Sequence, residues 1–346
     1  MEIIRLSQFS AGAGCGCKIA PDVLESILEK QEGEDFSVRD LIIGNGSRDD
    51  AAVMRLDSNR ALISTTDFFT PIVDDPFDFG YIAAVNALSD IYAMGGQPLL
   101  AIAILGWPVD QLGTDVASEV LRGGRAACRE AGLPLAGGHS IEAPEPFFGL
   151  AANGLVELSH IKRNDTAQKG DLLFLTKPLG IGLFSSAEKR AIASADERQM
   201  AHESMKMLNK VGSVLGKIEG VHALTDVTGF GLAGHLMEIC RGSGLSARLE
   251  ISAVPRFEFV ERLIEEGCTP NGTNRNWRSY GEHIQGADDF GLKLIADPQT
   301  SGGLLIACAS SSQAEVQDVL RAHGLCTEPI GELKADETEE PGILVQ

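Results

Sequence analysis

Short β-rich runs alternate with helical segments along most of this chain, and this alternation limits its possible folds more than any other feature. Such an order is typical of a mixed α/β (α+β) protein, in which helices flank mixed sheets. In the first half we expect helices at residues 21–30, 79–94 and 114–131, with strands at 51–56, 61–66, 99–105, 133–136 and 148–157. In the second half we expect strands at 171–176, 247–251, 293–296 and 304–307, helices at 197–215 and 313–322, and a further helix opened by residues 223–234.

Two domains are expected because the chain has 346 residues. A single hydrophobic core usually stops growing at about 250–300 residues. Residues 1–18 are rich in small residues and lack a periodic apolar face, which indicates a flexible arm. We therefore divide the chain into an N-terminal arm (1–45), an N-terminal domain (46–158) and a C-terminal domain (159–346).

The overall charge favours a small substrate. The chain has 49 acidic and 29 basic side chains and a net charge of −20, which repels nucleic acids and anionic membranes. Its longest strongly apolar run, residues 99–107, is too short to span a bilayer, and residues 1–30 lack the apolar region of a signal peptide. We expect a cytoplasmic protein whose seven cysteines are reduced thiols.

Two neighbouring carboxylates precede an expected strand. Asp49 and Asp50 come between a turn-forming Gly-Asn-Gly stretch and the strand at 51–56. Adjacent strand residues point to opposite faces, so both cannot serve one site through the same geometry. A solvated turn pair is the alternative for this motif alone. Asp67 ends the next expected strand and, if the two strands form a hairpin, lies near Asp50.

Two other aspartates lie in apolar or glycine-rich surroundings. Asp90 is in an apolar helix, four residues after Asn86, so both polar side chains share one helix face. A buried carboxylate is costly without a metal or a hydrogen-bond donor. Asp226 ends a strand before Gly229-Phe230-Gly231, at a helix start suited to phosphate. Separated carboxylates, completed by phosphate and water, are the ligands that Mg²⁺ requires.

The glycines at 229–234 also match the dinucleotide-binding fingerprint, with Glu250 after the next strand. We give nicotinamide binding less weight than metal–ATP binding, because Asp226 would repel a metal-free pyrophosphate there. No P-loop motif occurs in the sequence. The loops at 136–140 and 297–303 are either tight turns or places where backbone approaches phosphate oxygens.

The motif Cys15-Gly16-Cys17-Lys18 is the remaining feature with chemical potential. Two cysteines alone supply too few ligands for a structural zinc site. A thiol near Lys18 should be partly thiolate, which suits a nucleophile or a carrier of a soft atom. Two ordinary surface cysteines on a frayed arm are the alternative.

Together these motifs resemble the selenophosphate synthetases, within the superfamily of aminoimidazole-ribonucleotide synthetase-like ATP enzymes. The resemblance covers essentially the whole chain and implies that superfamily's two-domain fold. It implies a reaction of selenide, ATP and water that gives selenophosphate, AMP and orthophosphate, in a homodimer with ATP near the domain junction. It rests on residues 12–18, Arg48-Asp49-Asp50, Ser64-Thr65-Thr66-Asp67, 86–96, Gly137-Gly138-His139-Ser140, 225–231 and 297–303.

The resemblance also implies roles for individual residues. Cys15 would be the essential chalcogen and Lys18 would contact ATP. The Mg²⁺ ligands would be Asp50, Asp90 and Asp226, and the nucleotide would be lined by Ser47, Arg48, Asp49, Asp67, Asp90, Gly138, His139 and Ser140. A monovalent cation such as K⁺, a selenium-delivery protein, and a natural selenocysteine in place of Cys15 stay open.

Other functions stay open as alternatives. Within the superfamily, these are a thiamine-monophosphate kinase or a hydrogenase-maturation dehydratase, and the arm of residues 15–18 argues against both. From another class, the alternative is a non-enzymatic thiol or metal carrier that uses Cys15 and Cys17. ATP turnover would exclude the carrier.

Overall fold

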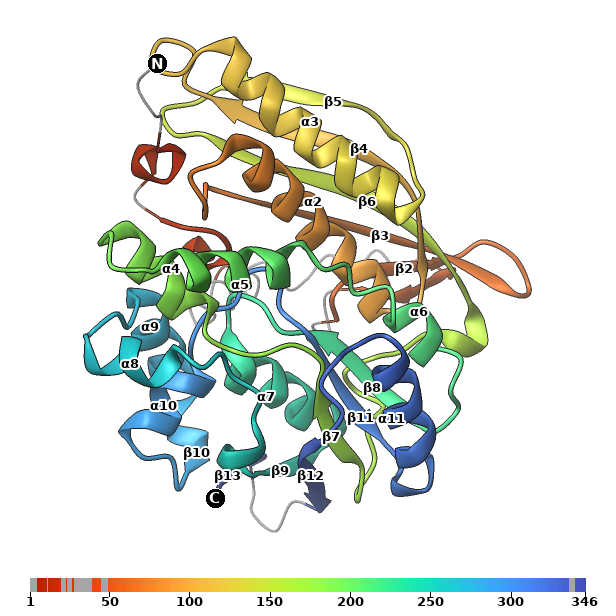
Figure 1. The fold of residues 1–346 in the computed structure, drawn as a ribbon. Helices are drawn as coiled ribbons and strands as arrows, with labels where there is room; N and C mark the ends of the chain where they lie inside the picture. Colours follow the sequence, from red (N-terminus) through yellow and green to blue (C-terminus); the bar gives the residue numbers. More distant parts are fainter. Residues whose placement is uncertain are drawn as a thin grey trace.

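The computed structural model describes residues 5–10, 12–19, 23, 27, 39–44, 49–335 and 340–346. In this part of the chain the two halves of the sequence form two mixed sheets, which lie one above the other in Figure 1 with helices α2, α4 and α5 between them. The expected mixed α/β architecture is confirmed. The helix expected at 21–30 lies outside the described residues, apart from residues 23 and 27.

A six-stranded sheet forms the first half, with the strand order β1-β2-β3-β6-β4-β5. The hairpin expected at its start is confirmed, because β2 and β3 pair antiparallel. The elements of this half are β1 (Leu41–Ile43), β2 (Ala52–Arg55), β3 (Arg60–Phe69), α2 (Pro76–Ala93), β4 (Gln97–Trp107), α3 (Thr114–Ala131), β5 (Leu135–Glu142), β6 (Phe147–Glu157) and the 3-10 turn η4 (Leu158–His160).

Helix α2 is the central element of the molecule. It begins at Pro76, and Asp75 caps it with a side chain that accepts a hydrogen bond from the Asp78 N–H. It ends before Gly95, which has the positive φ of 75° common after helices. Its residues are buried on nearly all sides, because it packs on α3 and β6 and also against β8 and α5 of the second half.

The two faces of the first sheet have different surroundings. Alternate residues of β3, including Thr65 and Asp67, share the face covered by α2, whereas Phe68 points to the opposite face. That opposite face is apolar and uncovered in the single chain. Ile102 and Ile141 on it are 43% and 53% exposed.

A seven-stranded sheet forms the second half, with the order β10-β13-β9-β12-β7-β11-β8. Its strands are β7 (Leu172–Leu175), β8 (Val221–Asp226), β9 (Leu245–Leu249), β10 (Ile284–Gln285), β11 (Leu304–Cys308), β12 (Pro329–Ala335) and β13 (Ile343–Val345). Its helices are α4 (Ile181–Lys189), α5 (Ala195–Lys206), α6 (Gly212–Leu215), α7 (Gly231–Ser243), α8 (Val260–Glu265), α9 (Asn271–Tyr280), α10 (Asp289–Ile295) and α11 (Gln313–Ala322), with short 3-10 turns η5 (Ile251–Ala253), η6 (Gly281–His283) and η7 (Ser310–Ser312).

Two expected elements of this half are wrong. Residues 293–296 are not a strand but the end of α10, which Asp288 caps by accepting a hydrogen bond from the Gly291 N–H. The helix expected at 197–215 is interrupted between α5 and α6. There the Met207 carbonyl accepts a bond from Lys177 Nζ, and the Asn209 amide donates to Ser89 and to the Gly302 carbonyl. These tertiary bonds replace helical ones.

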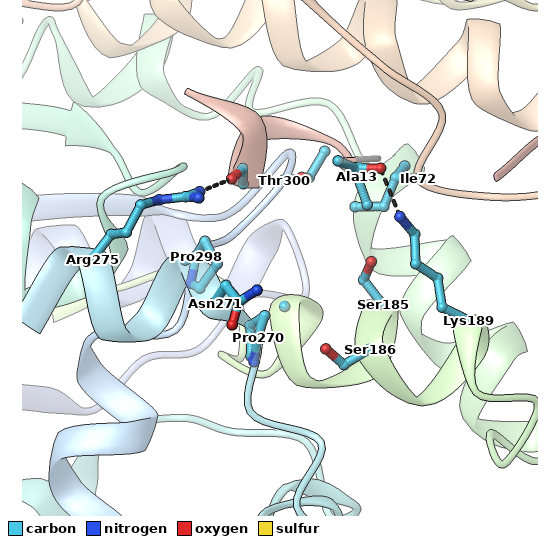
Figure 2. A pocket seen from close by; sticks show the side chains of 14 residues that line it. Ala13, Ile72, Ser185, Ser186, Lys189, Pro270, Asn271, Arg275, Pro298 and Thr300 are labelled. Carbon is cyan, nitrogen blue, oxygen red and sulfur yellow. Dashed lines mark hydrogen bonds between the residues drawn. The ribbon is translucent and has the colours of Figure 1, made fainter. Parts of the chain in front are cut away.

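The described part of the N-terminal arm packs against both halves. It contains the 3-10 turns η1 (Leu6–Phe9) and η2 (Cys15–Cys17), and Leu6 is fully buried. The Gly14 N–H donates to the Thr70 carbonyl after β3, 3.0 Å away. Lys189 Nζ donates to the Gly12 carbonyl at 2.7 Å, and Arg275 donates to the Gly16 carbonyl (Figure 2). The mobility of the arm stays a prediction.

No helix in the described ranges is long and apolar enough to cross a membrane.

Candidate active site

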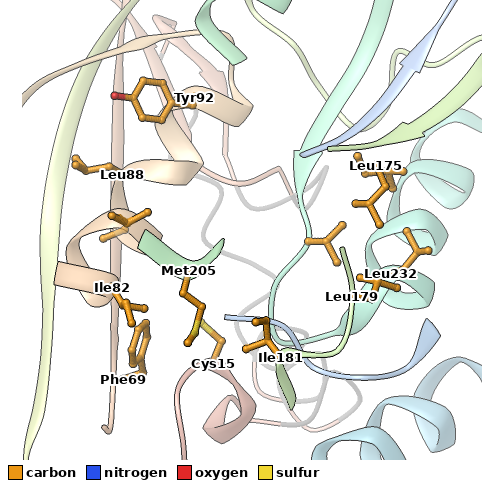
Figure 3. Close-up of a cluster of buried hydrophobic side chains, with 14 of the residues drawn as sticks. Cys15, Phe69, Ile82, Leu88, Tyr92, Leu175, Leu179, Ile181, Met205 and Leu232 are labelled. Carbon is orange, nitrogen blue, oxygen red and sulfur yellow. The ribbon is translucent and has the colours of Figure 1, made fainter. Parts of the chain in front are cut away.

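Cys15 lies where the two halves of the chain meet. Its side chain is among the apolar residues that line this junction, close to Met205 and Ile181 in Figure 3. Only 1% of the residue is exposed. Its backbone N–H donates to Thr300 Oγ1 at 3.0 Å, and its thiol donates to Asn86 Oδ1 at 3.3 Å. Cys15 is therefore held in a defined place between α2 and the loop at 297–303.

Asn86 connects the cysteine to the first carboxylate. Its Oδ1 accepts bonds from the Cys15 thiol and from the Ser301 N–H, which is 2.7 Å away. Its Nδ2 donates to Asp67 Oδ2 at 2.5 Å. The amide is fully buried, so both of its ends must find partners. The spacing of four residues thus places Asn86 and Asp90 on the same face of α2, and this face lies at the junction.

Four of the five aspartates singled out in the sequence, Asp50, Asp67, Asp90 and Asp226, accept a hydrogen bond or end a strand at this junction. Thr65 of β3 donates to Asp90 Oδ2, and Thr225 of β8 donates to Asp50 Oδ1 at 2.8 Å. Asp226 follows Thr225 at the end of β8 and is 2% exposed. The four carboxylates come from both halves of the chain.

The carboxylates interact electrostatically. Burial and the nearby Asp226 carboxylate raise the pKa values of Asp50 and Asp90 well above the usual range. Burial also raises the pKa of Asp67, although the Lys18 ammonium opposes this shift. Desolvation would lower the pKa of Lys18, but the surrounding negative groups, Asp67 and Cys15 first among them, raise it. Lys18 thus serves as the counter-ion of an acidic site.

The residues present fit a hard divalent cation. The Oδ2 atoms of Asp50 and Asp226 are buried and have no hydrogen-bond partner among the described residues. Orphaned buried carboxylate oxygens are costly, and a cation would remove this cost. Within the described ranges no group of three or more acidic, histidine or cysteine side chains is placed so that it could hold a metal ion without other ligands. The arrangement therefore suits Mg²⁺, which retains water and phosphate oxygens in its shell.

Other residues expected at the nucleotide do not join the acidic cluster of the same chain. Asp49 points away from Asp50, because its Oδ1 accepts a bond from the Asn164 N–H at 2.7 Å. Gly138, His139 and Ser140 are exposed on the edge strand β5, which β6 and β4 separate from Asp67 on β3. Strands lie about 4.8 Å apart, so this separation is roughly 14 Å. Ser47 and Arg48 lie outside the described residues.

The loop at 297–303 supports the site from the second half. Asp297 is fully buried, which raises its pKa to about 8, and its Oδ2 accepts a bond from the Gly182 N–H. Ser301 adopts a φ of 51°, which is strained for a residue with a side chain. Its N–H binds Asn86, its hydroxyl binds the Met205 carbonyl, and its own carbonyl accepts from Lys177.

Sequence reasoning missed three of these supporting residues: Asn86 as a hub, Thr300 and Lys177. Burial lowers the pKa of Lys177 to about 7, and its ammonium group donates to the Met207 and Ser301 carbonyls. Only Asn86 carried a signal, its spacing of four residues from Asp90. Thr300 and Lys177 act through contacts between distant segments, which local patterns do not reveal.

The structure explains why glycines occur at 229–234, where the sequence matches the dinucleotide-binding fingerprint. A side chain on Gly229 would lie 2.6 Å from the Cys15 carbonyl oxygen and 3.1 Å from Lys18 Cδ. Gly231, with a φ of 71°, starts α7. The turn thus lets the segment at 15–18 approach the end of β8, which agrees with our preference against a dinucleotide site.

Two family models match most of the chain. They describe the N-terminal and C-terminal domains of AIR synthase related proteins and match residues 48–156 and 168–343. A selenide, water dikinase of Pseudomonas putida is 58% identical over 332 residues, or 96% of each chain, and one of Aeromonas hydrophila is 55% identical over 335 residues, or 97% of each. The solved structure of hydrogenase maturation protein HypE in complex with ATP is similar in fold, with a TM-score of 0.63, 22% identity, and coverage of 96% of this chain and 90% of that one.

Proposed function

Because this chain belongs to the selenide, water dikinase family of AIR synthase-related enzymes, we propose that Cys15, Lys18 and the aspartates carry out its reaction. The family's reaction is the ATP-dependent phosphorylation of selenide, which gives selenophosphate, AMP and orthophosphate. The single observation that carries the assignment to residues is the path Cys15–Asn86–Asp67, which joins the thiol to the acidic cluster in two hydrogen bonds.

The proposed roles follow from chemistry and placement. Asp50, Asp90 and Asp226 hold Mg²⁺, which supplies charge neutralisation for the ATP phosphates when it is bound. Lys18 offers an ammonium group to phosphate oxygens from the same cluster, since acidic groups keep it protonated. Cys15 presents a soft sulfur to selenium, and Asn86 fixes its orientation. Phosphoryl transfer depends mainly on such positioning and electrostatic stabilisation.

The nucleotide product tests the reaction. We expect ³¹P NMR of the protein with MgATP and selenide under anaerobic conditions to show AMP, orthophosphate and a selenophosphate resonance. AMP forms because both phosphoanhydride bonds are cleaved in this reaction. Stoichiometric accumulation of ADP would instead identify a simple kinase, and no ATP turnover would favour the thiol or metal carrier.

We also propose that two copies of the chain form a homodimer through the uncovered face of the first sheet. Phe68, Ile102 and Ile141 are exposed on this face, on β3, β4 and β5 respectively, and apolar patches of this kind mark interfaces. His139 shares the face with Ile141, two positions away on β5. A second copy packed there would cover His139 and could place it beside the partner's nucleotide, which accounts for the separation of β5 from Asp67 in one chain.

Replacing Ile102 with aspartate should disrupt this dimer, because it buries a charge in an apolar interface. We expect light scattering after gel filtration to give twice the chain mass of 36.7 kDa for the native protein and the single mass for Ile102→Asp. The matched control is Leu344→Asp, since Leu344 is 42% exposed on β13 of the other sheet. A native monomer, or a dimer of Ile102→Asp, would contradict the proposed interface.

The domain bounds stay a proposal as well. The first sheet ends at Glu157 and the second begins at Leu172, so a division after residue 158 leaves each sheet whole.

A further inference from the structure

A threonine hydroxyl holds one oxygen of a proposed metal ligand. Thr225 is the last but one residue of β8 and is fully buried. Its Oγ1 donates to Asp50 Oδ1 at 2.8 Å, across 175 sequence positions and from the second half of the chain to the first. The Asp226 carbonyl is also near this hydroxyl, but at 3.5 Å it is too distant for a strong bond. The single hydroxyl proton is therefore used for Asp50.

The bond from Thr225 makes the two carboxylate oxygens of Asp50 different. Oδ1 accepts the hydroxyl proton, whereas Oδ2 is buried and has no hydrogen-bond partner among the described residues. The Oδ2 atom of Asp226, the next residue after Thr225, is in the same state. The terminal torsion of an aspartate is broad, so an unheld carboxylate presents either oxygen. A bond to Oδ1 removes this freedom and leaves Oδ2 as the oxygen that can bind an ion.

The donor itself is held in place by the second sheet. Strand β8 is at one end of the strand order of this sheet, next to β11, and α2 of the first half packs against it. Thr225 pairs with Leu305 of β11 in the ladder between the two strands. A β-branched side chain has few χ1 rotamers, and a fully buried one cannot exchange its partner for water. The Thr225 hydroxyl therefore has a fixed direction toward Asp50.

The neutral character of the donor suits a cation site. A lysine or arginine in the place of Thr225 would also orient Asp50, but its charge would repel Mg²⁺ and compete with it for the carboxylate. A hydroxyl orients the carboxylate and leaves its negative charge available. Asp90 has a donor of the same kind, because Thr65 of β3 donates to its Oδ2. Two of the three proposed Mg²⁺ ligands are thus oriented by threonine hydroxyls.

We infer that Thr225 is a positioning residue for Mg²⁺, whose hydroxyl holds Asp50 Oδ1 and leaves Asp50 Oδ2 for the ion. This inference rests on the proposed function, which assigns Mg²⁺ to Asp50, Asp90 and Asp226. Replacing a residue that orients a metal ligand typically costs 10–100-fold in metal affinity or activity. If the bond only joined the two halves of the chain, its loss would lower the stability of the fold and leave the affinity for Mg²⁺ unchanged.

The test titrates Mg²⁺ at a fixed concentration of a nonhydrolysable ATP analogue and follows the melting temperature, so it needs neither selenide nor turnover. Thr225→Val removes the hydroxyl with little change of shape. We expect it to increase the Mg²⁺ concentration that gives half of the rise in melting temperature by about tenfold or more. Thr225→Ala removes the same hydroxyl and should act in the same way. Thr225→Ser keeps the donor and should stay close to the native value. In the AMP-forming reaction, high Mg²⁺ should restore most of the activity of Thr225→Val.

Thr176→Val is the matched control. Thr176 is 1% exposed, and its Oγ1 accepts a bond from the Leu304 N–H at 2.8 Å, so the change removes a buried hydroxyl bond without touching a carboxylate. It should lower the melting temperature and leave the Mg²⁺ titration unchanged. The same Mg²⁺ titration for Thr225→Val and the native protein would overturn the inference. Loss of affinity in Thr225→Ser as large as in Thr225→Ala would also overturn it, whether or not Thr225→Val folds. A native protein without any response to Mg²⁺ would instead refute the proposed metal site itself, and with it the inference.

Discussion

The Cys15→Ser protein should form no selenophosphate above background, a loss of at least about a thousandfold. A serine hydroxyl is essentially un-ionised at neutral pH and does not bind selenium as sulfur does. The change exchanges one atom, and serine can still donate to Asn86 Oδ1 as the thiol does. The loss should therefore come from the missing reactivity of the sulfur and not from unfolding. The melting temperature should stay near that of the native protein.

Cys17→Ser is the matched variant, because it makes the same atomic exchange two residues away. We expect it to keep a substantial part of the activity, since Cys15 is the cysteine seen joined to Asn86 and thereby to Asp67 in the described part of the chain. Selenophosphate is measured by ³¹P NMR with anaerobic selenide and MgATP. Equal losses in both variants would refute a single nucleophile and indicate a redox or metal-binding pair. Full activity of Cys15→Ser would remove cysteine from the mechanism.

The sequence predicted the aspartates well because each follows a local rule. Asp90 is polar within an apolar helix, and Asp226 ends a strand before glycines, and both conditions can be recognised without a structure. The prediction that Asp49 and Asp50 point apart used strand geometry, but both residues come before β2; they do have separate partners, the Asn164 N–H and Thr225. Local patterns thus predict which residues have unusual surroundings.

The residues that local patterns missed act across long sequence separations. Thr300 binds Cys15 across 285 positions, and Lys177 reaches Ser301 across 124. The wrong strand at 293–296 has a related cause. A short apolar run is compatible with either a strand or a buried helix. Here the Asp288 cap and the burial of Leu294 and Ile295 stabilise a helix.

The position of β5 could not be predicted from the single chain either. The expected role of Gly138, His139 and Ser140 at the nucleotide stays a prediction, and within one chain the sheet order places them at the edge, beyond β6 and β4 from Asp67. Strand order depends on which runs pair, and pairing is set by long-range packing rather than by local composition.

The Asp226→Asn protein should lose Mg²⁺-dependent ATP turnover by about a hundredfold or more. A metal that neutralises developing phosphate charge lowers the activation free energy by several kcal/mol. Each 1.36 kcal/mol changes the rate about tenfold. Asp226 is the most informative of the three proposed ligands, because it raises the pKa values of both Asp50 and Asp90 and has a buried oxygen without a described partner. We expect Asp50→Asn and Asp90→Asn to act in the same direction.

The fold should survive this substitution. Asparagine removes repulsion with Asp50 and Asp90 but also attraction to Lys18 and Lys177, so the two changes in the free energy of unfolding oppose each other. The melting temperature without metal should therefore change little. MgATP should raise it in the native protein and raise it much less in Asp226→Asn, since a ligand stabilises only the state that binds it.

Asp318→Asn is the control, because this exposed carboxylate pairs with Arg321 on α11, and the substitution should leave both measurements unchanged. Near-native turnover by all three ligand variants would exclude the metal assignment. If turnover falls while the thermal shift with MgATP is retained, Asp226 does not hold the ion, and the loss must come from its effect on Lys18. The pair of measurements thus distinguishes a metal ligand from a carboxylate that only sets the charge of its neighbours.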